Sequence, residues 1–317
     1  MTTEPLVSVI IPAFNAARWI EAAVTSATSQ TWPNVEVTVV DDGSTDDTAR
    51  IVQAMDDSCV HLVRQENAGA AAARNVGLCN SRGDLVQFLD ADDLLAPDKL
   101  ALQIEALRQS PAGSVASCAW ARFGTDPGSA VFMYEPVWSE SEPIEWIIKS
   151  LSGGGMMQPA CWLTPRAIAE QAGPWDETLS LHDDTEYFTR VLLQSRMNVF
   201  VGATKVYYRD VPDSLSRRRG RAAVVSALAV CVSRHRHLLA ARDSNAARRA
   251  IATQYAQFTY EFGAAAPDLA AQALDAVSRL GAQPLNEIGG GAFRTLAALL
   301  GFRTASALHA LLSRLRA

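Results

Sequence analysis

The chain has 317 residues, of which 49% are hydrophobic and 20% are charged, and this composition is typical of a globular protein rather than a disordered one. The formal net charge is −6 at pH 7. This charge argues against nucleic acid as a partner, because binding phosphates requires a surplus of Lys and Arg on one face.

The first hundred residues alternate short runs rich in Val and Ile with helical patterns, which is typical of a parallel sheet built from βαβ units. The expected elements, in chain order, are a strand at 6–11, a helix at 16–30, a strand at 35–40, a helix after the capping sequence 44–47, a strand at 59–63, a helix at 70–80, a strand at 84–89 and a helix opened by Pro97. The amino-terminal part is therefore predicted to be an α/β layer structure.

From about 115 to 210 the pattern changes to shorter apolar runs broken by Gly and Pro. The runs at 115–123, 130–134 and 199–208 predict a mixed sheet with long loops. The triple glycine at 153–155 indicates a loop between a helix and a strand.

After residue 216 the sequence is rich in Ala, Leu and Arg and has helical periodicity to the end. Breaks are expected near Pro267, Pro284 and 289–291. We place a boundary near residue 212, which divides the chain into an α/β domain at 1–212 and an α-helical region at 213–317.

Cysteine usage and the amino terminus point to a reducing compartment. The five cysteines are odd in number and lack the close spacing of a zinc site, so neither structural zinc nor a complete disulfide framework is predicted. The amino terminus lacks the pattern of a signal peptide. The longest nearly apolar stretch, 222–232, is shorter than the roughly 20 residues that span a bilayer. We expect a cytoplasmic protein, either free or peripheral on the inner face of the membrane.

Three of the predicted strands end in polar segments, at 12–15, 41–44 and 90–93. Open parallel sheets bind ligands beyond the carboxyl ends of their strands, so these segments are expected to converge. Two carboxylates separated by one residue, Asp90 and Asp92, can reach a divalent cation that also takes diphosphate oxygens. Alone, such an acidic turn would more simply end a strand and cap a helix.

Five linked segments resemble those of the family 2 glycosyltransferases. They are the sequences VSVIIPAFN at 7–15, VVDDGSTD at 39–46, NAG at 67–69, ARNVG at 73–77 and FLDADD at 88–93. The resemblance covers about residues 6 to 210 and not the helices that follow. It implies the α/β GT-A fold, a Rossmann-like mixed sheet flanked by helices, with a nucleotide-binding half at 1–110 and an acceptor-binding half at 111–212.

The same resemblance implies roles for residues of a donor site. Pro12 and Ala13 should contact a nucleoside through their backbone, Asp41 should hydrogen-bond the base or ribose, and Arg74 should lie near the base or diphosphate. The alternatives without a binding function are that Asp41 is a turn residue and that Arg74 is a solvated charge on a helix. The full predicted set of donor-nucleotide-binding residues is Pro12, Ala13, Asn15, Asp41, Arg74, Asp90 and Ala91.

The resemblance divides the acidic pair of the DAD sequence between two tasks. Asp90 would reach the ribose or a metal-bound water, and Asp92 would ligate Mn²⁺ or Mg²⁺. A metal in that position supplies a Lewis acid that stabilises a departing diphosphate.

An acceptor hydroxyl is a poor nucleophile, so an inverting transfer needs a carboxylate that removes its proton. Asp183 and Asp184 resemble the family's Glu-Asp pair that opens a helix, with Asp183 in place of the Glu. We expect Asp184 to be the base, with Asp183 as the runner-up or as a group that orients the acceptor. Both acids could instead only favour a helix amino terminus through the dipole. Trp162 and Trp175 could stack on a sugar or belong to the core.

The segment after the last predicted strand departs from the family pattern. Family members commonly place a His there, and this chain has none between Tyr207 and Gly220. Arg217, Arg218 and Arg219 are either contacts for the diphosphate or a solvated basic run.

The carboxyl-terminal segment 288–317 contains no acidic residue and interleaves arginines with leucines. A basic amphipathic helix of this kind can lie on an anionic membrane surface. The alternative is that the leucines pack on the helical bundle or on a second subunit, giving a homodimer.

The expected function is that of an inverting, metal-dependent glycosyltransferase. It would use a nucleoside diphosphate sugar, expected to be a UDP-sugar, and a hydroxyl acceptor on a glycan, a lipid carrier or a small metabolite. One alternative is a non-catalytic nucleotide-sugar-binding or scaffold protein. A nucleotidyltransferase is disfavoured because 12–15 occupies the place of its Gly-rich basic loop.

Overall fold

The computed structural model describes residues 4–211, 220–285 and 288–316, and their contacts divide into two compact units. The first unit holds the chain up to Pro143, then 157–178 and the described residues from Asp183 to 211. The second unit takes 144–156, 179–182 and the described residues from 220 onward. The chain thus enters the second unit twice before the helical region begins.

The first unit is built on a five-stranded sheet with the order β3-β2-β1-β4-β7. Its strands are β1 (Val7–Ala13), β2 (Val35–Asp42), β3 (Val60–Gln65), β4 (Leu85–Phe88) and β7 (Thr164–Pro165). All neighbours are parallel except β4 and β7. The apolar runs of β1 and β2 are buried on both faces, as expected of parallel strands covered by helices.

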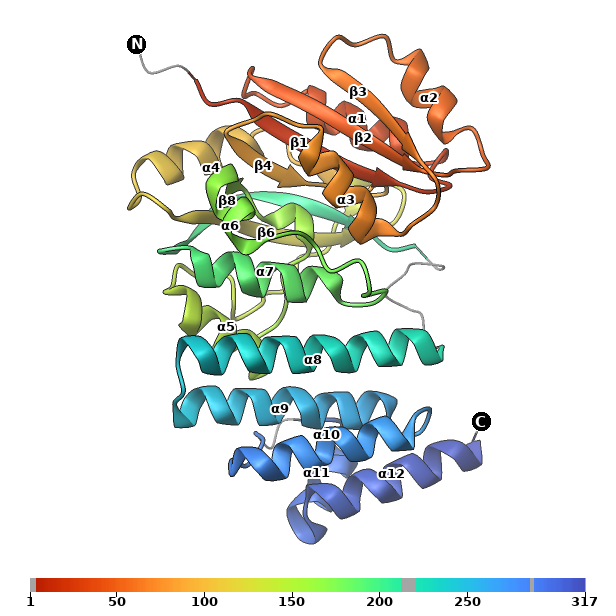
Figure 1. The fold of residues 1–317 in the computed structure, drawn as a ribbon, viewed down its shortest axis with the longest axis vertical. Helices are drawn as coiled ribbons and strands as arrows, with labels where there is room; N and C mark the ends of the chain where they lie inside the picture. The colour runs from red at the N-terminus through yellow and green to blue at the C-terminus, as the bar shows by residue number, and fades with distance from the viewer. Residues whose placement is uncertain (1–3, 212–219, 286–287, 317) are drawn as a thin grey trace. The chain divides into compact units, whose positions relative to one another are not determined.

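Helices follow the strands and cover this sheet. They are α1 (Ile20–Thr28), α2 (Thr48–Ala54) and α3 (Ala70–Cys79), and Figure 1 shows α3 in front of the sheet and α1 behind it. The approach of α3 depends on Gly77, because a Cβ there would collide with the Ile10 side chain of β1. Close packing of α3 on the sheet brings the helix within reach of the strand ends.

A smaller sheet has the order β5-β8-β6. Its strands are β5 (Leu94–Leu95), β6 (Val115–Phe123) and β8 (Asn198–Arg209), with β6 parallel and β5 antiparallel to β8. The helix α4 (Lys99–Arg108) packs on β6 and β8 of this sheet, whereas α6 (Arg166–Ala172) contacts β4 and β7 of the large sheet and α7 (Asp183–Gln194) packs on α6. Two 3₁₀ turns lie at Pro127–Ser129 and Pro159–Cys161. The mixed α/β fold expected from the sequence is confirmed.

Two local predictions were wrong. The run 130–134 is not a strand: Val131 makes only an isolated bridge to Arg122, and the residues at 132–134 are exposed irregular chain. The segment 44–47 does not form a capping box, because the Ser44 hydroxyl accepts from the Asn15 amide rather than from the start of α2. Asp46 accepts from the Thr48 amide in its place. In both cases, tertiary contacts decided what the local pattern left open.

The second unit is helical in its described part. It contains most of α5 (Pro143–Leu151) and the helices α8 (Arg221–Ala241), α9 (Asn245–Phe262), α10 (Pro267–Leu280), α11 (Gly291–Leu300) and α12 (Phe302–Arg316), with α8 and α9 side by side in Figure 1. The Ser244 hydroxyl caps α9, and Pro267 opens α10 at a position where its missing N–H costs little. The predicted breaks near Pro267 and 289–291 are therefore present.

The last two helices bury one apolar face and expose another. Phe293 and Ala305 are buried against α9, and Leu296 is partly buried on the same cluster. Five other leucines are exposed, so they do not pack on the bundle: Leu299, Leu300, Leu308, Leu311 and Leu312. Within the described residues, no helix is long and apolar enough to cross a bilayer.

Candidate functional site

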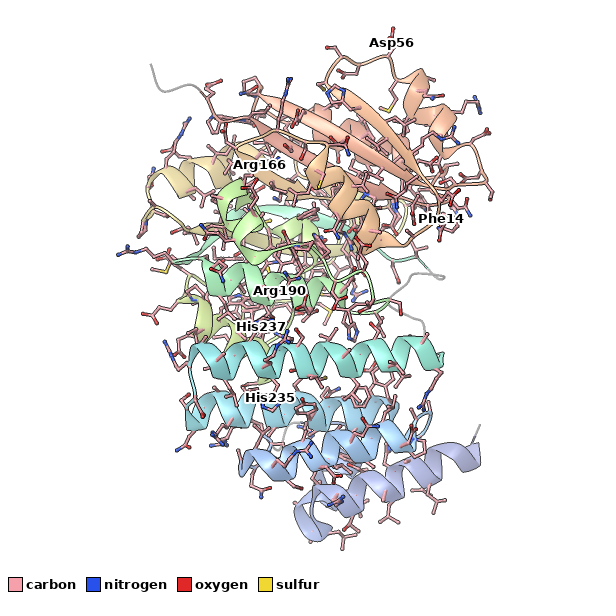
Figure 2. The ribbon with its side chains drawn as sticks, viewed as in Figure 1. Phe14, Asp56, Arg166, Arg190, His235 and His237 are labelled. Carbon is pink, nitrogen blue, oxygen red and sulfur yellow. The ribbon has the colours of Figure 1, made fainter. Side chains whose placement is uncertain are left out.

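The polar strand ends meet at one edge of the large sheet, because β2, β1 and β4 are parallel neighbours. The register pairs Ala13 with Asp41, and the acidic segment that begins at Asp90 follows the end of β4. Figure 2 shows Phe14 at this edge and Arg166 on the opposite side of the unit. Arg166 donates to the Gly83 carbonyl, at the amino end of β4. The predicted donor residues therefore share the edge where ligands of open parallel sheets bind.

The loop after β1 is tied to the turn after β2. Asn15 has a left-handed backbone, with φ of 50°, and its side-chain oxygen accepts from the Thr45 amide at 2.8 Å. The Asn15 amide donates to the Ser44 hydroxyl at 2.9 Å. Asn15 thus links the loop after β1 to the turn after β2 through hydrogen bonds. These bonds also hold the neighbouring backbone of Pro12 and Ala13 in place.

The first acidic turn, Asp41 and Asp42, is stabilised mainly by hydrogen bonds. Asp41 is buried, accepts from the Ser44 amide at 3.1 Å and pairs with the exposed Arg64 at 3.3 Å. Asp42 accepts from the Ala68 and Gly69 amides at 2.8 and 2.9 Å. Asp42 therefore organises the entry to α3, which is the structural role that a turn residue is expected to have.

The Asn67-Ala-Gly69 segment is part of the same turn. The Asn67 side chain donates to the Asp42 carbonyl at 2.9 Å. Gly69 has φ of 96°, a backbone conformation that glycine adopts without strain.

Arg74 joins the two halves of the predicted site. Its guanidinium is buried on α3 and donates to Asp90 and to Asp183, at 2.8 Å in each case. It also lies over the Trp175 ring, with its carbon 4.4 Å from the ring centre. Burial alone would lower the pKa of Arg74, but the Asp90 and Asp183 carboxylates outweigh burial and raise it. Arg74 is therefore a permanently charged link between the strand-end acids and the acids of α7.

The second acidic turn, 90–93, is poorly compensated. Burial and the neighbouring Asp90 carboxylate raise the pKa of Asp92 to about 6. No other residue in the described part of the chain donates a hydrogen bond to the Asp92 carboxylate. Burial and the carboxylates of Asp92 and Asp90 raise the pKa of Asp93 well above its usual range. One of the Asp93 carboxylate oxygens has no hydrogen-bond partner. Ala91 lies between the acids, so its backbone belongs to this turn.

Asp183 and Asp184 open α7, as predicted. Asp183 is held by Arg74, whereas burial and the adjacent Asp183 carboxylate raise the pKa of Asp184 to about 6, against the opposing charge of Arg74. A carboxylate with this pKa is ionised at neutral pH and can accept a proton. Asp184 therefore has the electrostatic properties that a general base needs.

The connection from α6 to α7 is fixed by Asn75 and Arg190. Asn75 exchanges hydrogen bonds with the backbone of Trp175 and also donates to Glu177 at 2.8 Å. Arg190 of α7, labelled in Figure 2, pairs with Glu186 at 2.8 Å and donates to the Pro174 carbonyl at 2.9 Å. These contacts set the position of the helix that begins with the two acids.

The two tryptophans left open by the sequence are core residues. Trp175 and Trp162 are almost fully buried. Trp175 stacks on Tyr187 with ring centres 4.1 Å apart, and Trp162 stacks on Phe188 at 5.3 Å. Trp175 serves the site indirectly, as the surface on which Arg74 rests.

Sequence reasoning gave no role to Arg209, the last residue of β8. Its amide donates to the Asp93 carboxylate at 2.8 Å, and its side chain donates to the Asp92 and Gly124 carbonyls at 2.7 and 2.8 Å. It also lies over the Trp19 ring at 4.3 Å. The only sequence signal was its position at the end of a strand. Arg217, Arg218 and Arg219 lie outside the described residues.

The structure thus brings Arg74, Asp90, Asp183 and Asp184 into one electrostatic network, to which Asp92 is coupled through Asp90. Asp41 is held separately by Arg64. A divalent cation fits this edge, since no other described residue donates to the Asp92 carboxylate and the nearby Asp90 is also acidic. Among the described residues, no three acidic, His or Cys side chains converge on one point. One or two carboxylates suffice for Mg²⁺ when diphosphate oxygens and waters complete its shell.

Comparison with known proteins identifies related sequences over the amino-terminal part. The model of the family described as Glycosyl transferase family 2 matches residues 8–170, just over half of the chain. Three curated relatives align over about a third of the chain.

One is named as a teichuronic acid biosynthesis glycosyltransferase, TuaG of Bacillus subtilis, with 45% identity over 109 residues, covering 33% of this chain and 43% of TuaG. Another is chondroitin synthase of Escherichia coli, with 41% identity over 107 residues, covering 33% of this chain and 16% of the synthase. The third is an uncharacterised glycosyltransferase of Haemophilus influenzae, with 38% identity over 109 residues, covering 33% and 44% of the two chains. The matched segment spans less than half the length of each of these relatives.

Solved structures match almost the whole chain. S. aureus TarS 1–349 in complex with UDP-GlcNAc superposes with a TM-score of 0.73 at 18% identity, covering 96% of this chain and 90% of TarS 1–349. The complex of the same protein with UDP gives a TM-score of 0.70 and covers 96% and 89%. At this identity the match shows that the fold is shared.

Proposed function

The chain belongs to glycosyl transferase family 2, and on that premise we propose that it transfers a sugar from a nucleoside diphosphate sugar to an acceptor hydroxyl with inversion at the anomeric carbon. The observation that carries this proposal is Arg74, which ties Asp90 on the donor side to Asp183 beside the candidate base. A site that only binds a nucleotide would not need the acids at the start of α7 to be linked, through Arg74, to the acids that follow β4.

On the donor side, the backbone of Pro12 and Ala13 and the side chain of Asp41 would receive the nucleoside. Asn15 keeps the loop after β1 in place for this contact. Arg74 and Asp90 would lie at the ribose or diphosphate, beside the backbone of Ala91. The UDP and UDP-GlcNAc complexes of the structurally similar TarS support a uridine nucleotide.

Asp92 would hold Mn²⁺ or Mg²⁺. The cation would relieve the repulsion between Asp92 and Asp90 and would act as a Lewis acid for the diphosphate. Diphosphate oxygens and waters would supply the remaining ligands.

On the acceptor side, Asp184 would accept the hydroxyl proton as the acceptor oxygen forms its bond to the anomeric carbon. The bond from that carbon to the diphosphate oxygen breaks, and its electron pair leaves with the nucleoside diphosphate. Asp183, held by Arg74, would orient the acceptor and keep Asp184 in place. A pKa near 6 leaves Asp184 ionised at neutral pH and still basic enough to take the proton.

The acceptor is proposed to be a glycan. The names of two relatives, which refer to teichuronic acid biosynthesis and to chondroitin, support a polysaccharide acceptor over a small metabolite or a lipid carrier.

A direct test is a panel of nucleoside diphosphate sugars, each added with and without Mn²⁺ while thermal unfolding is followed. At least one UDP-sugar should raise the midpoint, and more so with Mn²⁺, because a ligand that binds only the folded state stabilises it. Product analysis by NMR should then show the anomeric configuration opposite to that of the donor. Stabilisation by none of the donors would contradict the proposal.

The exposed leucines of α11 and α12 are proposed to mediate peripheral membrane contact or a homodimer. Pelleting with vesicles of phosphatidylglycerol and phosphatidylcholine distinguishes membrane contact from dimer formation, since only membrane contact gives salt-dependent pelleting. Light scattering would detect the dimer. Neither effect, or effects unchanged by a Leu299→Asp and Leu311→Asp double variant, would contradict a contact through these leucines.

A further inference from the structure

The loop after β6 carries four consecutive apolar residues that the fold leaves exposed. Val131, Phe132, Met133 and Tyr134 have 63%, 47%, 68% and 75% of their surfaces accessible. Single exposed apolar residues are ordinary, but a contiguous exposed run on a soluble unit is typical of a binding surface. Nothing in the proposed transfer reaction uses these four side chains.

Beside this run lies a surface groove of about 270 Å³ on the small sheet, which we call the β8 groove. Its lining residues are Ala119, Phe132, Tyr134, Trp138, Phe200, Gly202, Ala203, Thr204 and Lys205. Four of the nine are aromatic. All of them belong to the first unit.

The aromatic rings of the β8 groove support one another. Trp138 and Phe200 are stacked, with ring centres 6.4 Å apart and planes 13° apart. Tyr134 meets Trp138 edge-on at 6.1 Å. The groove therefore offers rigid ring surface at little cost in side-chain entropy.

Polar groups lie next to these rings because β8 bulges at this point. The register with β6 passes from Cys118↔Val201 directly to Ala119↔Lys205, which leaves 202–204 without partner residues on β6. Gly202 and Ala203 are exposed, so a ligand in the groove can approach this part of the backbone.

Lys205 adds a positive charge. Its ammonium lies 5.1 Å from the Phe132 ring centre and 5.9 Å from that of Tyr207. In the described part of the chain, no carboxylate forms an ion pair with it. An anionic group on a ligand would provide the missing partner.

We propose that the β8 groove binds a carboxylate-bearing sugar of the acceptor glycan, at a position remote from the reacting hydroxyl. The apolar C–H face of a sugar ring can lie on Phe132 and Tyr134, its hydroxyls can bond the bulged backbone, and its carboxylate can pair with Lys205. A lipid tail would satisfy the rings but would desolvate the backbone groups and the ammonium without giving them partners.

The distance along β8 fits such a subsite. Arg209 lies four positions after Lys205, or about 13 Å along the strand, and its amide donates to Asp93 of the acidic turn. An acceptor of several sugars could span this distance from the groove to the acidic turn, whereas a monosaccharide could not. The inference rests on the proposed function only in that the acceptor is a glycan.

The test is calorimetric titration with three probes: an unsulfated chondroitin hexasaccharide, which has a uronate at alternate positions, maltohexaose, which is neutral, and decyl maltoside below its micelle concentration, which carries an alkyl tail. The chondroitin hexasaccharide should bind saturably and maltohexaose at least about tenfold more weakly. Lys205→Gln and a Phe132→Ala and Tyr134→Ala double variant should each weaken the first binding about tenfold or more. Met156→Ala, which alters an exposed apolar side chain of the second unit, should leave it unchanged.

Binding of neither saccharide, equal binding of both, or full binding by the groove variants would overturn the proposal. Binding of decyl maltoside alone would identify a lipid tail and would also overturn it. UDP binding should be the same in all variants. If the wild-type protein did not bind UDP, that result would count against the proposed transferase function and not against the proposed binding of a glycan in the β8 groove.

Discussion

The two acidic turns of the large sheet lie at the same edge but are stabilised differently. The first, Asp41 and Asp42, ends β2, and the second, 90–93, follows β4. Asp42 accepts two backbone amides, and Asp41 accepts one amide and pairs with Arg64. In the second turn, burial and mutual repulsion raise the pKa of Asp92 to about 6. Similar sequences therefore produce one turn whose acids are mostly paired within the fold, although one Asp41 oxygen has only the ion pair with Arg64, and one turn whose acids repel each other.

The difference indicates where ligand binding should have the largest effect. A carboxylate that already accepts backbone hydrogen bonds gains little from an added cation. A buried carboxylate beside another acid gains a great deal, because the cation removes the repulsion. The second turn, together with Asp184 across Arg74, is the part of the edge that is arranged for ligand charge.

The largest expected effect is on turnover in Asp184→Asn. The amide cannot take the acceptor proton, so kcat should fall about 10³-fold, while UDP affinity stays within about twofold of the wild-type value. Rates come from nucleoside diphosphate release, and Asp47→Asn, at the exposed residue that precedes α2, is the matched control. Turnover of Asp184→Asn equal to that of the control would remove the base assignment.

A large effect on stability is expected for Arg74→Met. Removing this buried cation leaves Asp90 and Asp183 without their partner, and the free energy of unfolding should fall by about 3 kcal/mol. Urea unfolding measures it. A loss below about 1 kcal/mol would mean that the two acids do not depend on Arg74.

The pH dependence of stability should distinguish the second turn from the first. The folded pKa of Asp92 lies near 6, above its ordinary value of 3.8. Between these values the folded chain binds more protons than the unfolded chain, so the Asp92 contribution favours folding at low pH and is lost as pH rises through 6. In metal-free buffer, Asp92→Asn should therefore have a higher thermal midpoint than wild type at pH 7.5, and the difference should shrink as the pH falls from 6 toward 3.8.

Activity should fall as the pH is lowered, whereas the Asp92 contribution to stability rises. Because Asp184 must be ionised to act as a base and its pKa is near 6, kcat/KM should fall about tenfold per unit below that pH. A flat profile from pH 7 to pH 5 would contradict the assignment.

The smallest effect is expected for Arg64→Met, a change on β3 that removes the ion pair with Asp41 of the first turn. Arg64 is largely exposed, and Asp41 keeps its hydrogen bond from the Ser44 amide, so the free energy of unfolding should change by about 1 kcal/mol or less. A loss as large as that of Arg74→Met would erase the contrast between the two turns.

The sequence predicted the parts of the site that depend on local periodicity. The strand patterns place Pro12, Asp41 and Asp90 at strand ends, and parallel pairing then brings those ends to one edge. The acidic start of α7 was also visible, since acids favour a helix amino terminus.

The parts that depend on long-range packing were not predictable. Arg74 and Asp183 are 109 residues apart, and only the packed unit shows that one guanidinium holds acids from both halves. Arg209 reaches Asp93 over 116 residues. The run 130–134 was predicted as a strand because its composition is apolar, but composition does not show whether a partner strand is available.

The central claim is that the second acidic turn holds a nucleoside diphosphate through a divalent cation at Asp92. Its most direct test is calorimetric titration of UDP into the wild-type chain and into Asp92→Asn, each with Mn²⁺ and with EDTA. Mn²⁺ should tighten UDP binding to the wild-type chain at least about tenfold, or about 1.4 kcal/mol, and should have almost no effect on Asp92→Asn. Equal UDP affinity with and without Mn²⁺ in the wild-type chain, or the same Mn²⁺ effect in both proteins, would contradict it.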